Sequence, residues 1–202
     1  EDCTEFDIAY GGKSYRAQIP CIGAHNVLNA LAGFGAGVAA GVKPEHAASA
    51  LANFRSTGMR QRARKCREVT VIEDCYNANP DSVKAAMLTL GSRKIPDGAK
   101  KIAVLGDMLE LGNRSSAEHY RIGRIAATKA DMLFTYGHHS LRTVTGAITG
   151  GMAPKNAEHF DTHEDLAHVL RTRAAEGDVL LFKGSRGMKM EQALHLFLDE
   201  EK

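Results

Sequence analysis

Acidic, amide and hydroxyl side chains gather in one short segment of this chain, residues 74–82, which reads Asp-Cys-Tyr-Asn-Ala-Asn-Pro-Asp-Ser. The β-branched run at residues 69–72 predicts a buried strand before it. Pro80 suits the first position of a helix, and Asn79 suits its N-cap. Backbone amides that favour anions would then lie beside the carboxylate of Asp74. The segment predicts a binding site at a strand end, although an ordinary capped helix would explain Asn79 and Pro80.

A second polar group stands at the start of a predicted helix, at His25, Asn26 and Asn29. One of these side chains can cap the helix, while the others can meet the edge of a base and the imidazole can stack on it. The residue types alone favour capping. The remaining histidines, including His138 and His139, lie in predicted helices or loops and are given no role.

A third polar group closes the last predicted strand, at Lys183, Ser185 and Arg186. Two cations, a hydroxyl and exposed amides beside Gly184 suit a carboxylate ligand. Asp107 also follows a predicted strand. Its carboxylate can belong to the site or can simply cap the loop, and the sequence favours neither interpretation.

The elements that must position these groups alternate along the second part of the chain. Strands are predicted at residues 69–73, 101–105, 132–136 and 179–183, with a weaker one at 158–160. Helices are predicted at residues 80–90, 116–129, 140–148, 164–176 and 188–198. This alternation predicts an α/β fold, a mostly parallel sheet with helices on both faces. The loops at the carboxyl ends of such strands converge on one crevice, so the motif loops should meet.

The first part of the chain has a different pattern. Apolar residues alternate on both sides of Gly11-Gly12, which predicts a hairpin, and helices are predicted from residue 25 to about 41 and from Pro44 onward. We place the domain boundary in residues 56–59, which gives domains 1–57 and 58–202. Gly12-Lys13-Ser14 imitates the end of a phosphate-binding Walker A loop, but the required earlier glycine is Asp7. A hairpin tip is the better interpretation.

Composition narrows the possible partners. The chain has 26 Lys+Arg against 24 Asp+Glu, so the net charge gives no reason to expect a nucleic acid or an anionic membrane as partner. The basic cluster at residues 60–67 is local and, apart from Arg60, is typical of a solvated face. No apolar stretch is long enough to span a bilayer. The four cysteines have no paired short spacing, which argues against a zinc or redox motif. Reduced thiols fit a cytoplasmic protein best.

The motif segments resemble the peptidoglycan Mur ligases. Residues 74–82 look like the family signature in the member that adds D-alanyl-D-alanine to UDP-N-acetylmuramoyl-tripeptide, and residues 22–31, 104–112 and 182–191 are similar to three further motifs in the same order. The resemblance implies a fragment. Residues 1–57 would be the end of the central ATP-binding domain, and residues 58–202 the Rossmann-like C-terminal domain.

The resemblance also implies ATP-dependent amide formation through an acyl phosphate. On the ATP side it places the adenine at His25, Asn26 and Asn29, the terminal phosphates at Arg60 and the ribose at Asp74. Arg60 and Asp74 are also the expected catalytic residues. On the dipeptide side it places Tyr76, Asn77, Asn79, Lys183, Ser185 and Arg186. The magnesium ligands and the phosphate loop are expected upstream, so no metal ligand is assigned here and the isolated chain is predicted to be an inactive monomer.

Two other interpretations stay open. Another Mur-type or a folylpolyglutamate-type ligase is the nearest, and the segments 77–80 and 183–188 argue against it. A non-catalytic α/β module that binds a nucleotide or a small acid belongs to a different class. The missing Walker residues favour that module for the isolated chain alone.

Overall fold

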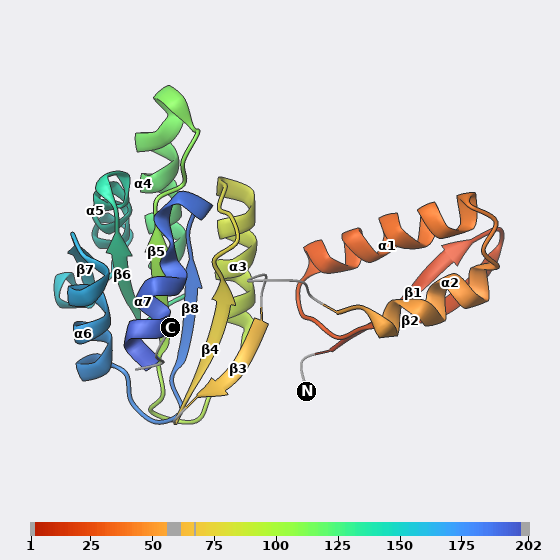
Figure 1. Ribbon diagram of the computed structural model, residues 1–202, viewed down its shortest axis with the longest axis horizontal. Helices are drawn as coiled ribbons and strands as arrows, with labels where there is room; N and C mark the ends of the chain where they lie inside the picture. The colour runs from red at the N-terminus through yellow and green to blue at the C-terminus, as the bar shows by residue number, and fades with distance from the viewer. Residues whose placement is uncertain (1–2, 56–61, 67, 199–202) are drawn as a thin grey trace. The chain divides into compact units, whose positions relative to one another are not determined.

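The structure is a computed structural model that describes residues 3–55, 62–66 and 68–198. The chain divides into two compact units, Glu1–Thr57 and Gly58–Lys202, coloured red to orange and yellow to blue in Figure 1. The first unit ends at the residue predicted for the domain boundary, while its assignment to an ATP-binding domain stays a prediction. Within the described residues, no helix is long and apolar enough to cross a membrane.

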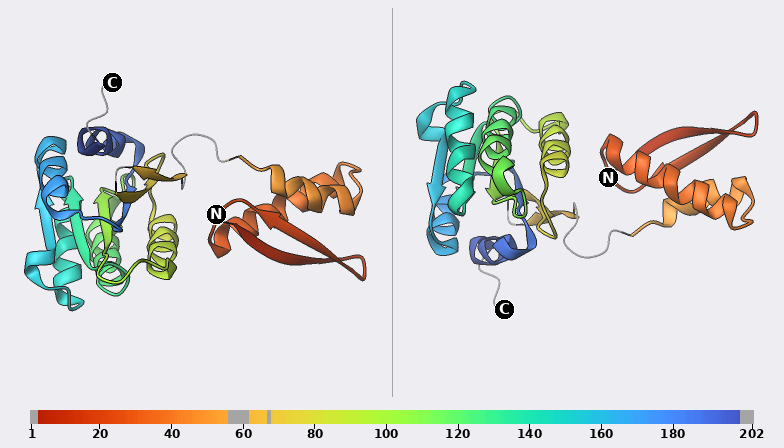
Figure 2. Two further views of the ribbon diagram at one scale, coloured as in Figure 1. Left: turned by 90° about the horizontal axis from the view of Figure 1, so that it is seen from below. Right: turned by 90° about the horizontal axis from the view of Figure 1, so that it is seen from above.

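The first unit is a hairpin with two helices on one side of it (Figure 2). Its elements are β1 (Thr4–Tyr10), β2 (Lys13–Ile19), α1 (Ala24–Ala39), α2 (Pro44–Ala50) and a 3-10 turn, η1 (Leu51–Asn53). Gly11 and Gly12 adopt φ values of 58° and 76° at the hairpin tip, which glycine does without strain. The prediction that Gly12-Lys13-Ser14 is a hairpin tip is therefore confirmed. Phe34 of α1 packs on Ile8 of β1 to form the core.

The second unit is built on a six-stranded sheet in the order β3-β4-β8-β5-β6-β7. Only β3 is antiparallel to its neighbour, and the other neighbouring strands are parallel. The α/β fold with a mostly parallel sheet is confirmed. The strands are β3 (Arg62–Cys66), β4 (Val69–Asp74), β5 (Lys101–Gly106), β6 (Met132–Tyr136), β7 (Ala157–Phe160) and β8 (Val179–Lys183).

Helices cover both faces of this sheet (Figures 1 and 2). They are α3 (Pro80–Ser92), α4 (Ser115–Ala126), α5 (Leu141–Thr149), α6 (His163–Arg173) and α7 (Met190–Leu198). Short 3-10 turns are η2 (Gly112–Arg114), η3 (His138–Ser140), η4 (Pro154–Asn156) and η5 (Arg186–Met188). One apolar cluster lies between the sheet and α3, α4 and α5, and a second lies between the sheet and α6 and α7. Successive side chains of a strand point to opposite faces, so each central strand contributes to both clusters.

Helices α4 and α5 approach each other closely. A Cβ added at Gly123 of α4 would lie 2.0 Å from the carbonyl oxygen of Thr143, and one added at Gly146 of α5 would lie 2.1 Å from that of Tyr120. Both distances are far below van der Waals contact. The two helix backbones therefore pack directly on each other through these glycines.

The edge strand β3 is the main departure from the sequence-based expectation. The described part of the basic cluster, Arg62–Cys66, forms a strand that was not predicted and that pairs antiparallel with β4. Charged residues on an edge strand keep other strands from pairing with it. The segment therefore has the composition of a solvated surface and the backbone of a strand. Arg60 and Arg67 lie outside the described residues.

Candidate active site

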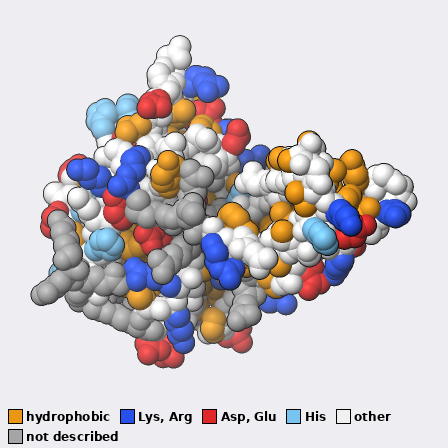
Figure 3. Space-filling model, turned by 45° about the vertical axis from the view of Figure 1, so that its right-hand side comes forward, with side chains coloured by type: hydrophobic (Ala, Val, Ile, Leu, Met, Phe, Trp, Pro, Cys, Tyr) orange, Lys and Arg blue, Asp and Glu red, His pale blue; other side chains and the backbone are white. Residues whose placement is uncertain are grey.

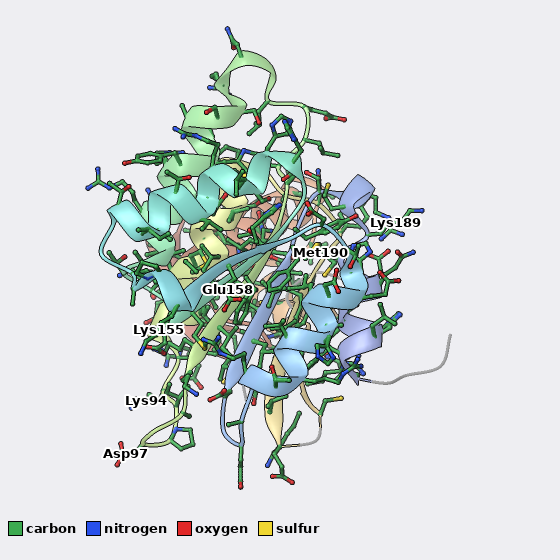
Figure 4. All side chains as sticks on the ribbon, turned by 90° about the vertical axis from the view of Figure 1, so that its left-hand side faces the viewer. Lys94, Asp97, Lys155, Glu158, Lys189 and Met190 are labelled. Carbon is green, nitrogen blue, oxygen red and sulfur yellow. The ribbon has the colours of Figure 1, made fainter. Side chains whose placement is uncertain are left out.

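Four loops meet at the carboxyl edge of the sheet. We call residues 74–79, 107–109, 137–140 and 183–189 the loop rim; they end or follow β4, β5, β6 and β8. Figure 4 shows Lys189 and Met190 at this end of the sheet, opposite Lys94 and Asp97, which precede β5. The prediction that the motif loops converge is confirmed, because β8 lies between β4 and β5.

A buried ion pair joins the ends of β4 and β8. Nζ of Lys183 lies 2.9 Å from Oδ2 of Asp74, and the two side chains are only 2% and 9% exposed. The register of the parallel strands places these two residues side by side. The same ammonium donates to the carbonyl oxygen of Asn77 at 2.9 Å. Lys183 therefore holds the loop after β4 against the end of β8.

Ser185 joins three loops at once. Its hydroxyl donates to the carbonyl oxygen of Ala78 at 3.1 Å and accepts from the amide of Leu109 at 2.9 Å. Its own amide donates to the carbonyl oxygen of Asp107 at 3.0 Å. The side chain is buried, so these bonds form away from water. Ser185 fixes the spacing of the loops after β4, β5 and β8.

Asp107 extends the network to β6. Its carboxylate accepts from the amides of His139 and Ser140 at 3.0 and 2.7 Å, and from the hydroxyl of Ser140 at 2.5 Å. The side chain is almost fully buried, and an ionised carboxylate bound by three donors is stable in such a place. Asp107 does cap a turn, as the loop-cap interpretation predicted. The turn is η3, which belongs to the loop after the neighbouring strand β6.

His119 of α4 contacts the loop after β5 from the interior of the second unit. Its Nε2 lies 3.0 Å from the amide of Met108 and its Nδ1 lies 2.8 Å from the carbonyl oxygen of Ser115. Burial lowers the pKa of His119, and the opposing effects of the Ser115 carbonyl and of Asp107 do not offset it. The imidazole is therefore neutral near pH 7. No role was predicted for this histidine, because an isolated histidine in an amphipathic helix carries no distinguishing pattern.

Three glycines let methionine side chains cover the strand ends. A Cβ at Gly184 would lie 2.6 Å from Cγ of Met190, and one at Gly106 would lie 2.7 Å from its sulfur. Gly137 has φ 107°, and its Cβ would lie 2.7 Å from the carboxylate of Asp107. Larger residues at these three positions would push the loops apart.

The upper side of the loop rim keeps exposed polar groups. Tyr76 and Asn77 are exposed after β4, and Arg186 is exposed in η5, where its guanidinium lies 3.0 Å from Oε1 of Glu191. Asn79 caps α3: its side chain accepts from the amide of Ser82 at 2.8 Å, as predicted for an N-cap. The sequence-predicted residues of the second unit that the structure describes thus lie at the loop rim, some at the surface and others as supports; Arg60 is outside the described residues.

The adenine-side residues lie in the first two turns of α1. Gly23 occupies the N-cap position, and no side-chain hydrogen bond caps the start of the helix. None of the three residues is therefore the cap. Asn26 donates instead to the carbonyl oxygen of Ile22 at 2.9 Å. His25 and Asn26 are half-buried, and Asn29 is exposed. The capping interpretation is therefore wrong for this helix, and base contact stays a prediction.

Comparison with known proteins assigns the family. A profile of the Mur ligase glutamate ligase domain matches residues 59–186, more than half of the chain. The chain belongs to the Mur ligase family. Its second unit is the C-terminal domain of such a ligase.

Individual Mur ligases are similar over most of the chain. The UDP-N-acetylmuramoyl-tripeptide--D-alanyl-D-alanine ligase of Bacillus subtilis is 40% identical over 176 residues, which cover 86% of this chain and 38% of that protein. A crystal structure of MurF from Acinetobacter baumannii superposes with a TM-score of 0.85 at 26% identity, over 98% of this chain and 43% of that one. MurF from Thermotoga maritima in complex with ADP gives 0.77 at 24% identity, over 98% and 46%. The chain spans less than half the length of each of these Mur ligases.

Proposed function

We propose that this chain is part of an ATP-dependent ligase that joins D-alanyl-D-alanine to UDP-N-acetylmuramoyl-tripeptide during peptidoglycan precursor synthesis. The observation that carries the proposal is the similarity, over most of the chain, to the Bacillus subtilis enzyme whose name states these substrates. The segment 74–82 adds support, because it brings amide and acidic groups to the loop rim.

We place the dipeptide at the loop rim. The planar guanidinium of Arg186 matches the two oxygens of a terminal carboxylate. Its side chain is 58% exposed, whereas that of its partner Glu191 is 15% exposed, so the guanidinium can be reached from solvent. Tyr76 and Asn77 would contact the same ligand from the loop after β4.

The buried members of the predicted site act in this proposal as supports. Lys183 and Ser185 hold the loops after β4, β5 and β8 at fixed spacing. Asn79 fixes the first turn of α3 through a capping box with Ser82. A rim that is rigid before the substrate arrives loses less entropy on binding.

We place ATP with the first unit and the end of β4. His25, Asn26 and Asn29 would contact the adenine, and Arg60 would reach the terminal phosphates. The carboxylate of Asp74 gives Oδ2 to Lys183, so a ribose hydroxyl would take Oδ1. We place the phosphate loop and the magnesium ligands in residues that precede this chain. The described residues contain no group of three or more His, Cys, Asp and Glu side chains that could hold a metal.

The proposed reaction has two steps. The terminal carboxylate of the tripeptide takes the γ-phosphoryl group of ATP, and ADP leaves. The dipeptide amine then attacks the acyl carbon, the bond from that carbon to the phosphate oxygen breaks, and the amine loses a proton as the amide forms. The contribution of this chain is to position the amine substrate and to stabilise charge.

The surface of the first unit supports its assignment to a larger ATP-binding domain. Leu28 of α1 is 65% exposed, and Leu31 of the same helix is also exposed. Apolar side chains are visible over this unit in Figure 3. Exposed apolar groups on one helix are typical of a surface that further protein covers.

We further propose a cytoplasmic monomer, in keeping with four free cysteines.

The test is acceptor selectivity in the full-length enzyme. Phosphate release with ATP and UDP-N-acetylmuramoyl-tripeptide should require D-alanyl-D-alanine and should not occur with single amino acids. Asp74→Asn and Arg60→Ala should each lower turnover by about tenfold or more, the effect of losing a charged contact. Lys84→Met, at an exposed position of α3, is the control. Preference for a single amino acid would indicate another Mur-type or a folylpolyglutamate-type ligase, and no turnover with any acceptor would indicate a binding module.

A further inference from the structure

Three consecutive residues after β5 are each fixed by a different partner. Asp107 is held by η3, and Leu109 donates to the hydroxyl of Ser185. Met108, between them, donates its amide to Nε2 of His119 at 3.0 Å. One of the three partners that hold the segment 107–109 is therefore a histidine on α4. Its side chain is buried and does not reach the surface of the loop rim.

The proton on this imidazole can be placed from its partners. The amide of Met108 is a donor, so Nε2 must present its lone pair. The carbonyl oxygen of Ser115, 2.8 Å from Nδ1, is an acceptor, so Nδ1 must carry the proton. Both ring nitrogens are thus used by the backbone. A proton added at Nε2 would point at the amide of Met108 and break that bond.

The charged and titratable groups around the ring come from two other elements. Oδ1 of Asp107 lies 4.0 Å from Nε2, and the ring of His139 lies 5.6 Å away between centroids. The carboxylate favours a second proton on the ring, and His139 opposes it. Burial is the largest influence and lowers the pKa of His119, so the neutral form required by the hydrogen bonds is the stable one.

We propose that His119 is a positioning residue of the ligase, whose neutral imidazole holds the amide of Met108 so that the next amide, of Leu109, meets the hydroxyl of Ser185. Its effect on catalysis rests on the proposed function, because Ser185 spaces the loops that would receive the amine substrate. Its effect on the segment 107–109 does not rest on that function.

The first test is independent of activity and uses the 202-residue chain. Nitrogen-15 spectra of the histidine rings at neutral pH should show Nδ1 of His119 protonated and Nε2 unprotonated. His119→Leu should speed hydrogen exchange at the amides of Met108 and Leu109 by about tenfold or more, because a buried donor loses its acceptor. His119→Gln, which keeps an acceptor near the same place, should restore most of the protection. His168→Leu, at an exposed histidine of α6, is the matched control.

The second test asks whether the loop matters for the reaction in the full-length enzyme. His119→Leu should raise KM for D-alanyl-D-alanine more than KM for ATP, and His119→Gln should recover toward wild type. An imidazole protonated at Nε2, or exchange at Met108 and Leu109 that matches the control, would overturn the proposal. The spectrum of the wild-type chain decides the first point even where His119→Leu does not fold. Wild-type protein without ligase activity would reject the proposed function and leave the exchange result standing.

Discussion

Loss of the buried ammonium at the end of β8 should destabilise the second unit severely. Nζ of Lys183 bridges Oδ2 of Asp74 and the carbonyl oxygen of Asn77, both at 2.9 Å. Lys183→Met would leave a carboxylate buried without its cation, which costs about 3–5 kcal/mol, and a carbonyl without its donor, about 1 kcal/mol more. We expect a loss of about 5 kcal/mol, or several thousandfold in the ratio of folded to unfolded molecules, at roughly 1.4 kcal/mol for each factor of ten. That is a large share of the stability of a typical domain, about 5–15 kcal/mol.

Hydrogen exchange at the amides of β8 measures this loss in the second unit alone. Lys84→Met makes the same substitution at an exposed position of α3 and should change stability by no more than about 0.5 kcal/mol. In an Asp74→Asn background, Lys183→Met should cost less, with a coupling of about 2 kcal/mol, because no charge is left behind. A loss below about 1 kcal/mol, or costs that simply add, would refute the reasoning.

Four other predictions concern packing, pH and ligands. Gly123→Ala should destabilise the second unit by about 3 kcal/mol in urea unfolding, because its Cβ would meet the backbone of α5; Gly33→Ala, with nothing within 4 Å, should instead stabilise the first unit by about 1 kcal/mol. Burial lowers the pKa of His119 from 6.5, so below about pH 6.5 the unfolded chain protonates this imidazole more readily than the folded chain does. Burial raises the pKa of Cys75 from 9.0, so above about pH 9 the unfolded chain loses the thiol proton more readily. Stability should therefore fall on both sides of that window, and a flat profile from urea unfolding would contradict the assignment. In the full-length enzyme, Arg186→Ala should raise KM for D-alanyl-D-alanine by about tenfold and KM for ATP less; equal effects would point away from a carboxylate contact. The isolated chain should bind ATP weakly and almost independently of magnesium in calorimetry, whereas tight, magnesium-dependent binding would mean that it contains a phosphate site.

Most of the fold could be predicted because the core strands are clearly marked in the sequence by their apolar and β-branched residues. The runs at residues 132–136 and 179–183 are apolar or β-branched and bounded by polar or glycine residues, and the observed strands have these bounds. β3 escapes such a prediction, since Arg64 and Lys65 give it the composition of a solvated loop. Its strand conformation depends on pairing with β4, which no local pattern records.

The convergence of the loops could be predicted, but the roles of individual residues could not. Parallel strands end at one edge, so polar residues after β4, β5 and β8 had to approach one another. The two hydrogen bonds of the Ser185 hydroxyl depend on β8 lying between β4 and β5, and strand order leaves no trace in the sequence. His119 stands four residues after Ser115, a spacing found in every helix. Its importance arises only where α4 meets the loop after β5.

The strand order also has a consequence for synthesis. Of the described strands, β8 is made last, yet it occupies the place between β4 and β5, which start 110 and 78 residues earlier in the chain. Until then these two strands have no common partner, and their apolar edges stay open to other chains. Closure of this sheet therefore depends on β8, and the loops of the loop rim cannot assemble before that strand is inserted. A ribosome that pauses before residue 179 would hold a chain that is vulnerable to aggregation, which makes the late segment a natural point for chaperone protection.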